Sequence, residues 1–346
     1  MKKALAILLV LVMALAAFGC APKEAAAPAA EAPAAEAAAP AAEAEAPAAE
    51  ATEAPAEEAK NWTIGYDNNG LANFFARAGK AAAEDEIAKL GCTIIHTVSE
   101  DTTTRTATIE NFVLQGVDAI IIEEGDVNEV RPALEDAKAA GIVIGSMDGG
   151  YIEGVTDVYV SSDNVKLGEA VGKMLVEYCG EEAQLLEVIS ESGSMIRARM
   201  EGVYSVTSQY PGIKFLYSFA YNWPDFYEDI KKKVESAIQA SPNPGDIDGV
   251  FASFDGVGVA ACDAFMEAGF TGETVSIVGV DGDPDAYEMM KKENSPYKAT
   301  IAQDPDTIAR TTVQKVVDIL NGVDIGESQI FIPGVVITKD NIPAEY

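Results

Sequence analysis

Acidic and aromatic side chains stand repeatedly just after short apolar runs in this 346-residue chain. Asp148 follows the run Val143–Ser146 after one residue, Asp281 directly follows Ser276–Val280, and Trp223 stands close behind another such run. Carboxylates accept hydrogen bonds from neighbouring hydroxyls, amides and arginine donate them, and rings pack on the C–H faces of a sugar. These residue types therefore favour a binding site for a neutral, polyhydroxylated small molecule.

The apolar runs have the composition of parallel strands that are covered on both faces, because they are β-branched and do not alternate with polar residues. The ten runs are Thr63–Tyr66, Thr93–Thr97, Ala119–Ile122, Val143–Ser146, Val158–Ser161, Leu185–Ile189, Phe215–Phe219, Val250–Ala252, Ser276–Val280 and Ala299–Ala302. Amphipathic stretches lie between the runs and end at glycines, which tolerate the left-handed turn at the end of a helix. These glycines are Gly91, Gly116, Gly141, Gly180, Gly269 and Gly322.

Repeated strand–helix–strand units build parallel sheets with right-handed crossovers. Ten strands are too many for one small domain, so we predict an α/β fold with two doubly wound parallel-sheet lobes. Ligands of such sheets lie in the crevice beyond the carboxyl ends of the strands. The residues that follow the strands are therefore expected to meet there.

The composition narrows the class of protein. The chain has 24 Lys and Arg residues and 56 Asp and Glu residues, so its net charge is −32. This charge argues against binding to nucleic acid and against docking on an anionic membrane surface, because both need positive charge on the protein. His96 is the only histidine, so a zinc site, a Ser-His-Asp triad or a proton shuttle would draw nearly every other group from Cys or carboxylate. We expect a binding protein rather than an enzyme.

Motifs for a nucleophilic serine, for phosphate binding and for metals are absent from the sequence. It has no Gly-x-Ser-x-Gly, no Gly-x4-Gly-Lys, no Cys-x2-Cys and no His-Glu-x2-His. The stretch Glu123–Asp126 lacks the alternating spacing of a calcium loop. We therefore expect no cofactor and no metal. A glycosidase that uses two of the crevice carboxylates is the enzymatic alternative.

The first sixty residues have the features of an export signal and a tether. In residues 1–20 two lysines precede the apolar run Leu5–Ala17, which is shorter than the ~20 residues that span a bilayer. The run ends Ala17-Phe18-Gly19-Cys20, which resembles a bacterial lipoprotein box with Ala17 in place of the usual Leu. We predict a lipidated Cys20, with ordinary signal cleavage nearby as the alternative. Residues 21–60 are almost entirely Ala, Glu and Pro, which predicts a disordered linker.

Three further cysteines lie in apolar surroundings at wide spacings: Cys92, Cys179 and Cys262. Their number is odd, and we predict buried thiols. One disulfide with one free thiol is the alternative.

Several segments stand in a characteristic order along the chain: Asn73-Phe74-Phe75, Asp118–Ile122, Met147-Asp148, Ser161–Asn164, Arg197 at a helix start, Val278–Gly282 and Thr300–Asp304. Through these segments the sequence, between about Trp62 and Ile337, resembles the type I periplasmic sugar-binding proteins of ABC importers, of the ribose- and galactose-binding kind. The resemblance implies two lobes joined by three crossings, near Ser162, Gln303 and Pro333. The implied lobes are residues 61–162 plus 304–332 and residues 163–303 plus 333–346.

The resemblance also implies a function. The chain would be an extracytoplasmic, lipid-anchored monomer that closes on a small-molecule ligand and delivers it to the permease of an ABC importer. A sensory receptor that presents a sugar or furanose signal to a membrane kinase or chemoreceptor is the alternative.

The resemblance implies ten ligand-binding residues. Aromatic side chains would line the site and stack on the sugar, an arginine would donate hydrogen bonds to it, and carboxylates and amides would complete the polar lining. They are Asn73, Phe74, Phe75, Glu123, Asp148, Arg197, Trp223, Phe254, Asp281 and Gln303. Each also has a purely structural interpretation. The two phenylalanines can belong to the core, the strand-end acids can cap turns, and Arg197 can be a solvated helix residue like Arg199.

Three departures from the family pattern bear on the ligand. Gly149 stands where ribose binders often have Arg, Phe254 where an amide is expected, and Glu123 where a neutral amide is more usual. The site loses donors and gains an acid and an aromatic ring, which disfavours ribose. It favours another pentose or hexose, a polyol, a methylated sugar or a nucleoside, and the excess of acids disfavours a sugar phosphate.

Overall fold

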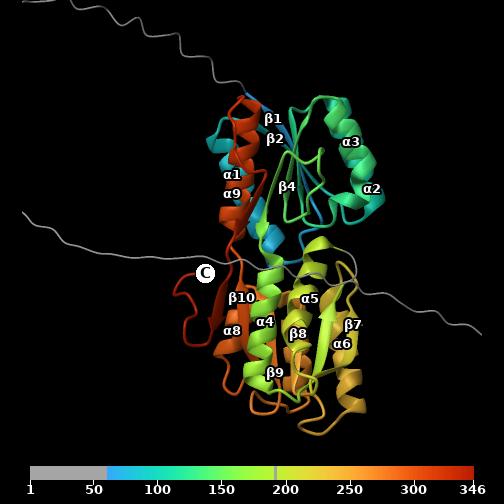
Figure 1. Cartoon of the computed structure of the whole chain (residues 1–346), viewed down its shortest axis with the longest axis vertical. Coiled ribbons are helices and arrows are strands. Elements are labelled where there is room, and N and C mark those ends of the chain that lie inside the picture. Colours follow the sequence, from blue (N-terminus) through green and yellow to red (C-terminus); the bar gives the residue numbers. More distant parts are fainter. Residues whose placement is uncertain (1–60, 191–192) are drawn as a thin grey trace, which may run out of the picture. The chain divides into compact units, whose positions relative to one another are not determined.

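The alternation of strands and helices builds two six-stranded sheets (Figure 1). The computed structural model describes residues 61–190 and 193–346. The predicted signal sequence, the linker and the lipidation of Cys20 lie outside the described residues. No helix among the described residues combines the length and the apolar character needed to cross a membrane.

The first sheet, in the order β11-β5-β4-β3-β1-β2, is parallel throughout. Its strands are β1 (Thr63–Asn68), β2 (Thr93–Val98), β3 (Ala119–Glu123), β4 (Val143–Met147), β5 (Val158–Ser162) and β11 (Gln329–Ile332). Helices α1 (Phe74–Lys89) and α9 (Pro305–Leu320) cover one face, and α2 (Thr102–Gln115) and α3 (Arg131–Ala139) cover the other (Figure 1). A short 3-10 helix, η1 (Val127–Val130), precedes α3. We call this sheet and its helices the first lobe.

The second sheet has the order β12-β10-β9-β8-β6-β7, and only β12 runs antiparallel to its neighbour. Its strands are β6 (Gln184–Ile189), β7 (Lys214–Ala220), β8 (Gly249–Ala252), β9 (Ser276–Asp281), β10 (Tyr297–Ala302) and β12 (Val335–Thr338). Helices α4 (Asn164–Cys179) and α5 (Ser194–Thr207) cover one face. The other face carries α6 (Phe226–Ala240), α7 (Asp255–Glu267) and α8 (Pro284–Lys291). We call this sheet and its helices the second lobe.

The chain passes between the two sheets three times. It leaves the first sheet after β5, returns between β10 and α9, and leaves again between β11 and β12. The predicted α/β fold class, with two doubly wound lobes, is confirmed. The exact lobe boundaries given for the sequence stay a prediction.

The edges of the sheets differ from the sequence-based expectation. All ten predicted strands are present, but β7 is an edge strand whose residues alternate between exposed and half-buried. The other predicted edge strand, β2, has no fully buried residue either. The expectation that every strand is covered on both faces is therefore wrong for β2 and β7, because the helices cover the strands at the edge of a sheet only in part. Strands β11 and β12 are not among the ten predicted strands.

The three cysteines of the described domain are all free thiols. Cys262 is buried as predicted, whereas Cys92 and Cys179 are only half-buried. Burial raises the pKa of the Cys262 thiol to about 11. The alternative with one disulfide does not hold for these three residues.

Candidate functional site

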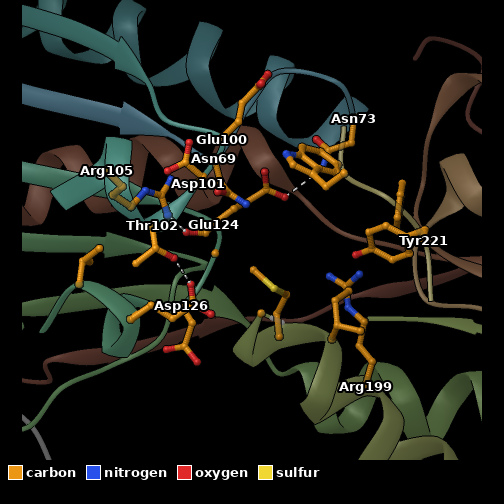
Figure 2. Close-up of a pocket in the computed structure, with 18 of the residues that line it drawn as sticks. Asn69, Asn73, Glu100, Asp101, Thr102, Arg105, Glu124, Asp126, Arg199 and Tyr221 are labelled. Carbon is orange, nitrogen blue, oxygen red and sulfur yellow. Dashed lines mark hydrogen bonds between the residues drawn. The ribbon is translucent and has the colours of Figure 1, made fainter. Parts of the chain in front are cut away.

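A cavity of about 390 Å³ lies at the carboxyl ends of the strands of both sheets (Figure 2). The first lobe contributes residues that follow β1, β2 and β3, and the second lobe contributes the start of α5 and residues at or after the ends of β7, β8 and β9. The main polar and aromatic lining residues are Asn69, Asn73, Arg105, Glu124, Asp126, Arg199, Tyr221, Trp223, Phe254 and Asp281. The cavity is therefore in the crevice where the topology of parallel sheets places ligands.

Four of the ten predicted residues line this cavity: Asn73, Trp223, Phe254 and Asp281. Two more lie behind the lining and contact it. The amide of Gln303 donates to Asp281 at 2.8 Å, and Asp148 lies 4.0 Å from a nitrogen of the lining residue Arg199. The structure does not bring the remaining four, Phe74, Phe75, Glu123 and Arg197, into the lining.

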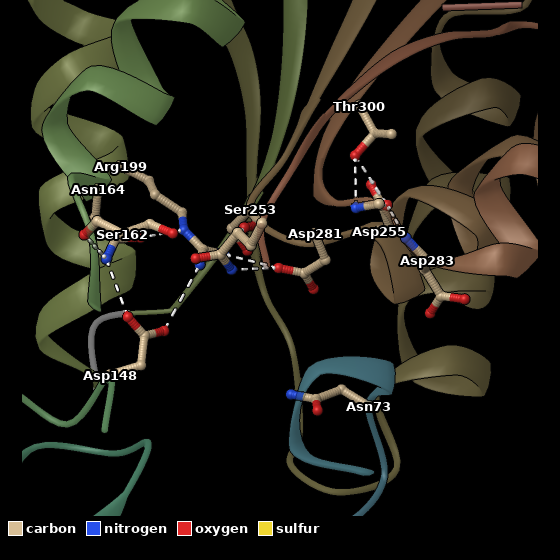
Figure 3. Close-up of polar contacts among 12 residues, drawn as sticks. Asn73, Asp148, Ser162, Asn164, Arg199, Ser253, Asp255, Asp281, Asp283 and Thr300 are labelled. Atoms are coloured by element: carbon tan, nitrogen blue, oxygen red, sulfur yellow. Dashed lines mark hydrogen bonds and ion pairs between the residues drawn. The ribbon is translucent and has the colours of Figure 1, made fainter. Parts of the chain in front are cut away.

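Arg199 is the arginine of the cavity, and its interpretation as a solvated helix residue is wrong, because its relative exposure is only 2%. Its Nε donates to Asn164 at 2.8 Å, and a terminal nitrogen donates to the carbonyl of Ser253 at 2.7 Å (Figure 3). The guanidinium also lies 3.6 Å from Asp281. It thus joins acids from both lobes, since Asp148 follows β4 and Asp281 ends β9.

Arg197 points elsewhere because of the periodicity of α5. The buried residues of this helix include Met195, Ile196, Arg199 and Val203, which recur every three to four positions, and Arg197 lies off that stripe. Its side chain is 48% exposed and makes an ion pair of 2.5 Å with Asp126 of the first lobe. Met195 and Ile196 lie about one helical turn before Arg199, on the same face of α5. This spacing of apolar residues is the sequence signal that could have identified the correct arginine.

The backbone directly after Asp281 is held by a buried aspartate that was not predicted as a site residue, Asp255. Asp255 accepts hydrogen bonds from the backbone N–H groups of Gly282 and Asp283 and from the hydroxyl of Thr300 (Figure 3). The hydroxyl of Tyr297 donates to its other oxygen at 2.7 Å. Burial raises the pKa of both Asp255 and Asp281, and Arg199 opposes the rise at Asp281.

Glu124, rather than the predicted Glu123, faces the cavity. The Glu123 side chain is fully buried and accepts hydrogen bonds from the hydroxyl of Tyr66 and the amide of Asn68. Glu124 has a positive φ of 55°, which turns the chain out of β3, and it accepts a hydrogen bond of 3.0 Å from Asn73. Burial raises the pKa of Glu124 to about 8.

The backbone around the cavity is strained at three acids. Among the described residues, four that are not glycine have positive φ, and Glu124, Asp148 and Asp281 are three of them. Such conformations cost free energy and tend to persist where function requires them. All three follow or end strands that point into the crevice, which supports a role in ligand binding.

Aromatic rings form one wall of the cavity. The rings of Trp223 and Phe226 are stacked with an interplanar angle of 18°, and Phe254 meets Phe226 edge-on at 4.9 Å between centroids. Trp223 also approaches the first lobe, because a Cβ added to Gly70 would lie 2.9 Å from its ring. The two predicted phenylalanines do not contribute to this wall: Phe75 is 1% exposed in the first-lobe core, and Phe74 is half-buried outside the lining.

Residues 64–324 match the family described as the periplasmic binding protein domain. The chain belongs to this family. It is 30% identical over 266 residues to the ribose import binding protein RbsB of Bacillus subtilis, and the aligned region covers 76% of this chain and 83% of that protein. It is 29% identical over 236 residues to the galactofuranose-binding protein YtfQ of Escherichia coli, with coverages of 66% and 73%.

Solved structures of solute-binding proteins share the fold. One from Actinobacillus succinogenes with bound D-allose is 26% identical, with a TM-score of 0.71 over 81% of this chain and 98% of that chain. Another, from Agrobacterium vitis with bound allitol, has a TM-score of 0.76 at 22% identity and covers 82% of this chain and 98% of that chain. The second likeness shows the fold alone.

Polar atoms near the cavity of this periplasmic binding protein lack partners within the described residues. They include Trp223 Nε1, the side-chain oxygen of Gln303 and the hydroxyl of Ser253, all shielded from solvent. A buried polar group without a partner is costly, so such groups are rare in folded proteins. A ligand that supplies the missing donors and acceptors would remove this cost.

Proposed function

We propose that this chain is the extracytoplasmic substrate-binding component of an ABC importer and that it captures a sugar or sugar-like ligand in the cavity between its lobes. The observation that carries the proposal is the guanidinium of Arg199, held between Asp148 of the first lobe and Asp281 of the second beside an aromatic wall. This combination of acceptors, one donor group and flat rings suits a hydroxyl-bearing ring or chain. The relatives named above are import and sugar-binding proteins, and none is named as a sensory receptor or a glycosidase.

In this proposal the lobes are rigid units that close about the three crossings after β5, β10 and β11. Ligand binding shifts the open–closed equilibrium only through contacts that the closed form alone completes. The lining residues Asn73 and Glu124 of the first lobe and Arg199, Trp223 and Asp281 of the second would make these contacts. Residues 1–60 would export the protein and hold it, as a monomer, on the membrane through a lipid on Cys20, beside its permease.

Thermal unfolding of the purified protein with a library of pentoses, hexoses, polyols and nucleosides tests the proposal. A ligand that binds only the folded state raises the unfolding temperature, so at least one compound should produce a dose-dependent rise. A complete library without any shift would count against a binding function for this cavity.

The aromatic wall gives a sharper test with the same ligand. We expect Trp223→Ala to weaken binding by more than about tenfold, or ~1.4 kcal/mol, because it removes the ring that lines the cavity and approaches Gly70. Trp62, the other tryptophan of the chain, lies outside the lining, and Trp62→Ala is the matched control. Unchanged affinity in Trp223→Ala, measured by titration calorimetry, would show that the ring only packs within its lobe.

A further inference from the structure

The cavity has a surplus of negative charge. Its lining contains six acidic side chains and two arginines. The acids are Glu100, Asp101, Glu124, Asp126, Glu129 and Asp281, and the arginines are Arg105 and Arg199. A cleft lined by one sign of charge between low-dielectric walls concentrates ligands of the opposite sign.

The protein itself already engages both arginines. Arg105 makes an ion pair of 2.9 Å with Asp67 and donates to the carbonyl groups of Glu123 and Glu124. Arg199 lies between Asp148 and Asp281, so one guanidinium faces two carboxylates. Both guanidinium groups therefore already have partners, and a third arginine, Arg197, pairs with the lining acid Asp126.

Glu124 is the inward-facing acid with the least compensation. Its carboxylate accepts from the neutral amide of Asn73 at 3.0 Å, and no cationic side chain of the described domain forms an ion pair with it. Burial raises the pKa of Glu124 and the charges of Asp148 and Asp281 raise it further, while the hydrogen bond from Asn73 and the charge of Arg199 lower it without cancelling the rise. A positive charge placed against this carboxylate would offset both effects.

An unpartnered acceptor behind the lining, next to Asp281, also calls for a donor. Gln303 is 8% exposed, and its amide nitrogen is used by Asp281, while its side-chain oxygen has no partner. An ammonium group offers three donors and no acceptor, whereas a hydroxyl both donates and accepts. The Glu124 carboxylate and this oxygen are both acceptors that an ammonium can satisfy, whereas the unpartnered Trp223 Nε1 calls for a hydroxyl oxygen elsewhere on the ligand.

We propose that the ligand of this cavity is a polyhydroxylated small molecule with one protonated amine, an amino sugar or an aminated polyol, whose ammonium group lies against Glu124. This inference rests on the proposed function, because it names the ligand class of the same cavity. It makes Glu124 the residue that sets specificity, while the aromatic wall and Arg199 hold the hydroxylated remainder of the ligand.

The test compares matched pairs of compounds that differ by one amine: glucose with glucosamine, galactose with galactosamine, and glucitol with glucamine. Titration calorimetry of the purified protein should show at least about tenfold tighter binding of the aminated member of at least one pair, or ~1.4 kcal/mol. In Glu124→Gln this preference should fall to about twofold or less, whatever the change in affinity for the neutral member. Glu129→Gln, which alters an exposed acid of the lining, should keep the preference.

The outcomes separate this inference from the proposed function. Neutral sugars that bind as tightly as their aminated partners overturn the inference and leave the sugar-binding function standing. A preference for the amine that survives in Glu124→Gln overturns the role of Glu124. Binding of neither class counts against the inference and the proposed function together.

Discussion

Glu123 shows how one buried carboxyl group can tie stability to pH. It is fully buried at the end of β3, and one of its oxygens has no partner and faces Gly79 of α1. Burial, followed by the charge of Glu124, raises the pKa of Glu123 well above its ordinary value. The folded protein therefore holds this proton more tightly than the unfolded chain, whose glutamates titrate near pH ~4.3. Stability is lost as the pH rises above that value, because only the unfolded state can release the proton easily.

We expect Glu123→Gln to be more stable than the parent at pH 8, by more than about 1 kcal/mol, roughly the value of one pKa unit. At pH 4 the two proteins should unfold alike, since both carry a neutral side chain there. Urea unfolding at the two pH values measures the difference, and the exposed Glu110→Gln is the control. A gain of equal size at both pH values would contradict the argument. Ligand affinity should change by less than about threefold, because Glu123 lies outside the lining.

The same residues show how far the sequence predicts the site. Asp148 and Asp281 could be placed because each follows a strand, and the topology brings strand ends together. Glu123 and Glu124 could not be distinguished, because successive residues of a strand point to opposite faces and the strand end is uncertain by one residue. In the same way, the sequence did not show which face of α5 is buried, so Arg197 was predicted to bind the ligand in place of Arg199.

At the scale of elements, the arginine of the cavity depends on the close approach of α4 and α5. A Cβ added to Gly168 of α4 would lie 2.0 Å from the carbonyl oxygen of Arg199, and one added to Gly202 of α5 would lie 2.1 Å from the carbonyl oxygen of Val165. Backbone atoms cannot rotate away as side chains can. The glycines therefore set the distance between these helices, and with it the position of Arg199.

We expect Gly202→Ala to destabilise the protein by about 1–3 kcal/mol, the usual cost of overpacking a close contact. It should also weaken ligand binding, because the shift of α5 moves Arg199 relative to Asp281. Gly172→Ala on the same interface is the graded comparison and should cost less, since its nearest contacts, Val206 Cβ at 2.9 Å and the Val203 carbonyl oxygen at 3.1 Å, are less close. Thermal unfolding and calorimetry measure both effects. A Gly202→Ala protein of normal stability would mean that the helices can separate without cost.

The elements themselves were largely predictable from the sequence. Buried parallel strands are continuous β-branched runs, and each of the six predicted helix-ending glycines has the positive φ that such a position requires. Strands β11 and β12 escaped prediction because each is four residues long and lies at the edge of its sheet, where β12 pairs antiparallel. Edge pairing depends on tertiary contacts that a local pattern does not contain.

At the scale of the whole molecule, the pair of Arg197 and Asp126 joins the two lobes beside the cavity. Burial alone raises the pKa of Asp126, but the hydrogen bonds from Arg197 and from the backbone of Asn128 outweigh it, and the pKa is lowered. The arginine comes from α5 of the second lobe and the aspartate caps η1 of the first. If the lobes open, this ion pair must break, so it stabilises the closed form alone.

We therefore expect Arg197→Met to weaken ligand binding by about two- to fivefold, within the ~1 kcal/mol of a partly exposed ion pair, and to leave the unfolding of the ligand-free protein unchanged. The loss should shrink as salt is raised toward ~1 M, because ions screen a half-exposed pair. Arg131→Met is the control, since Arg131 is similarly exposed and its ion pair with Glu135 lies within α3 of one lobe. Calorimetry at low and high salt measures the ligand affinity of Arg197→Met. An affinity equal to that of the parent protein at both salt concentrations would contradict the role of the Arg197–Asp126 pair in closure. A salt-independent loss of affinity of more than about a hundredfold would instead support the sequence-based expectation that Arg197 itself donates to the ligand. A direct contact in a closed cavity contributes several kcal/mol to binding, and salt screens it poorly.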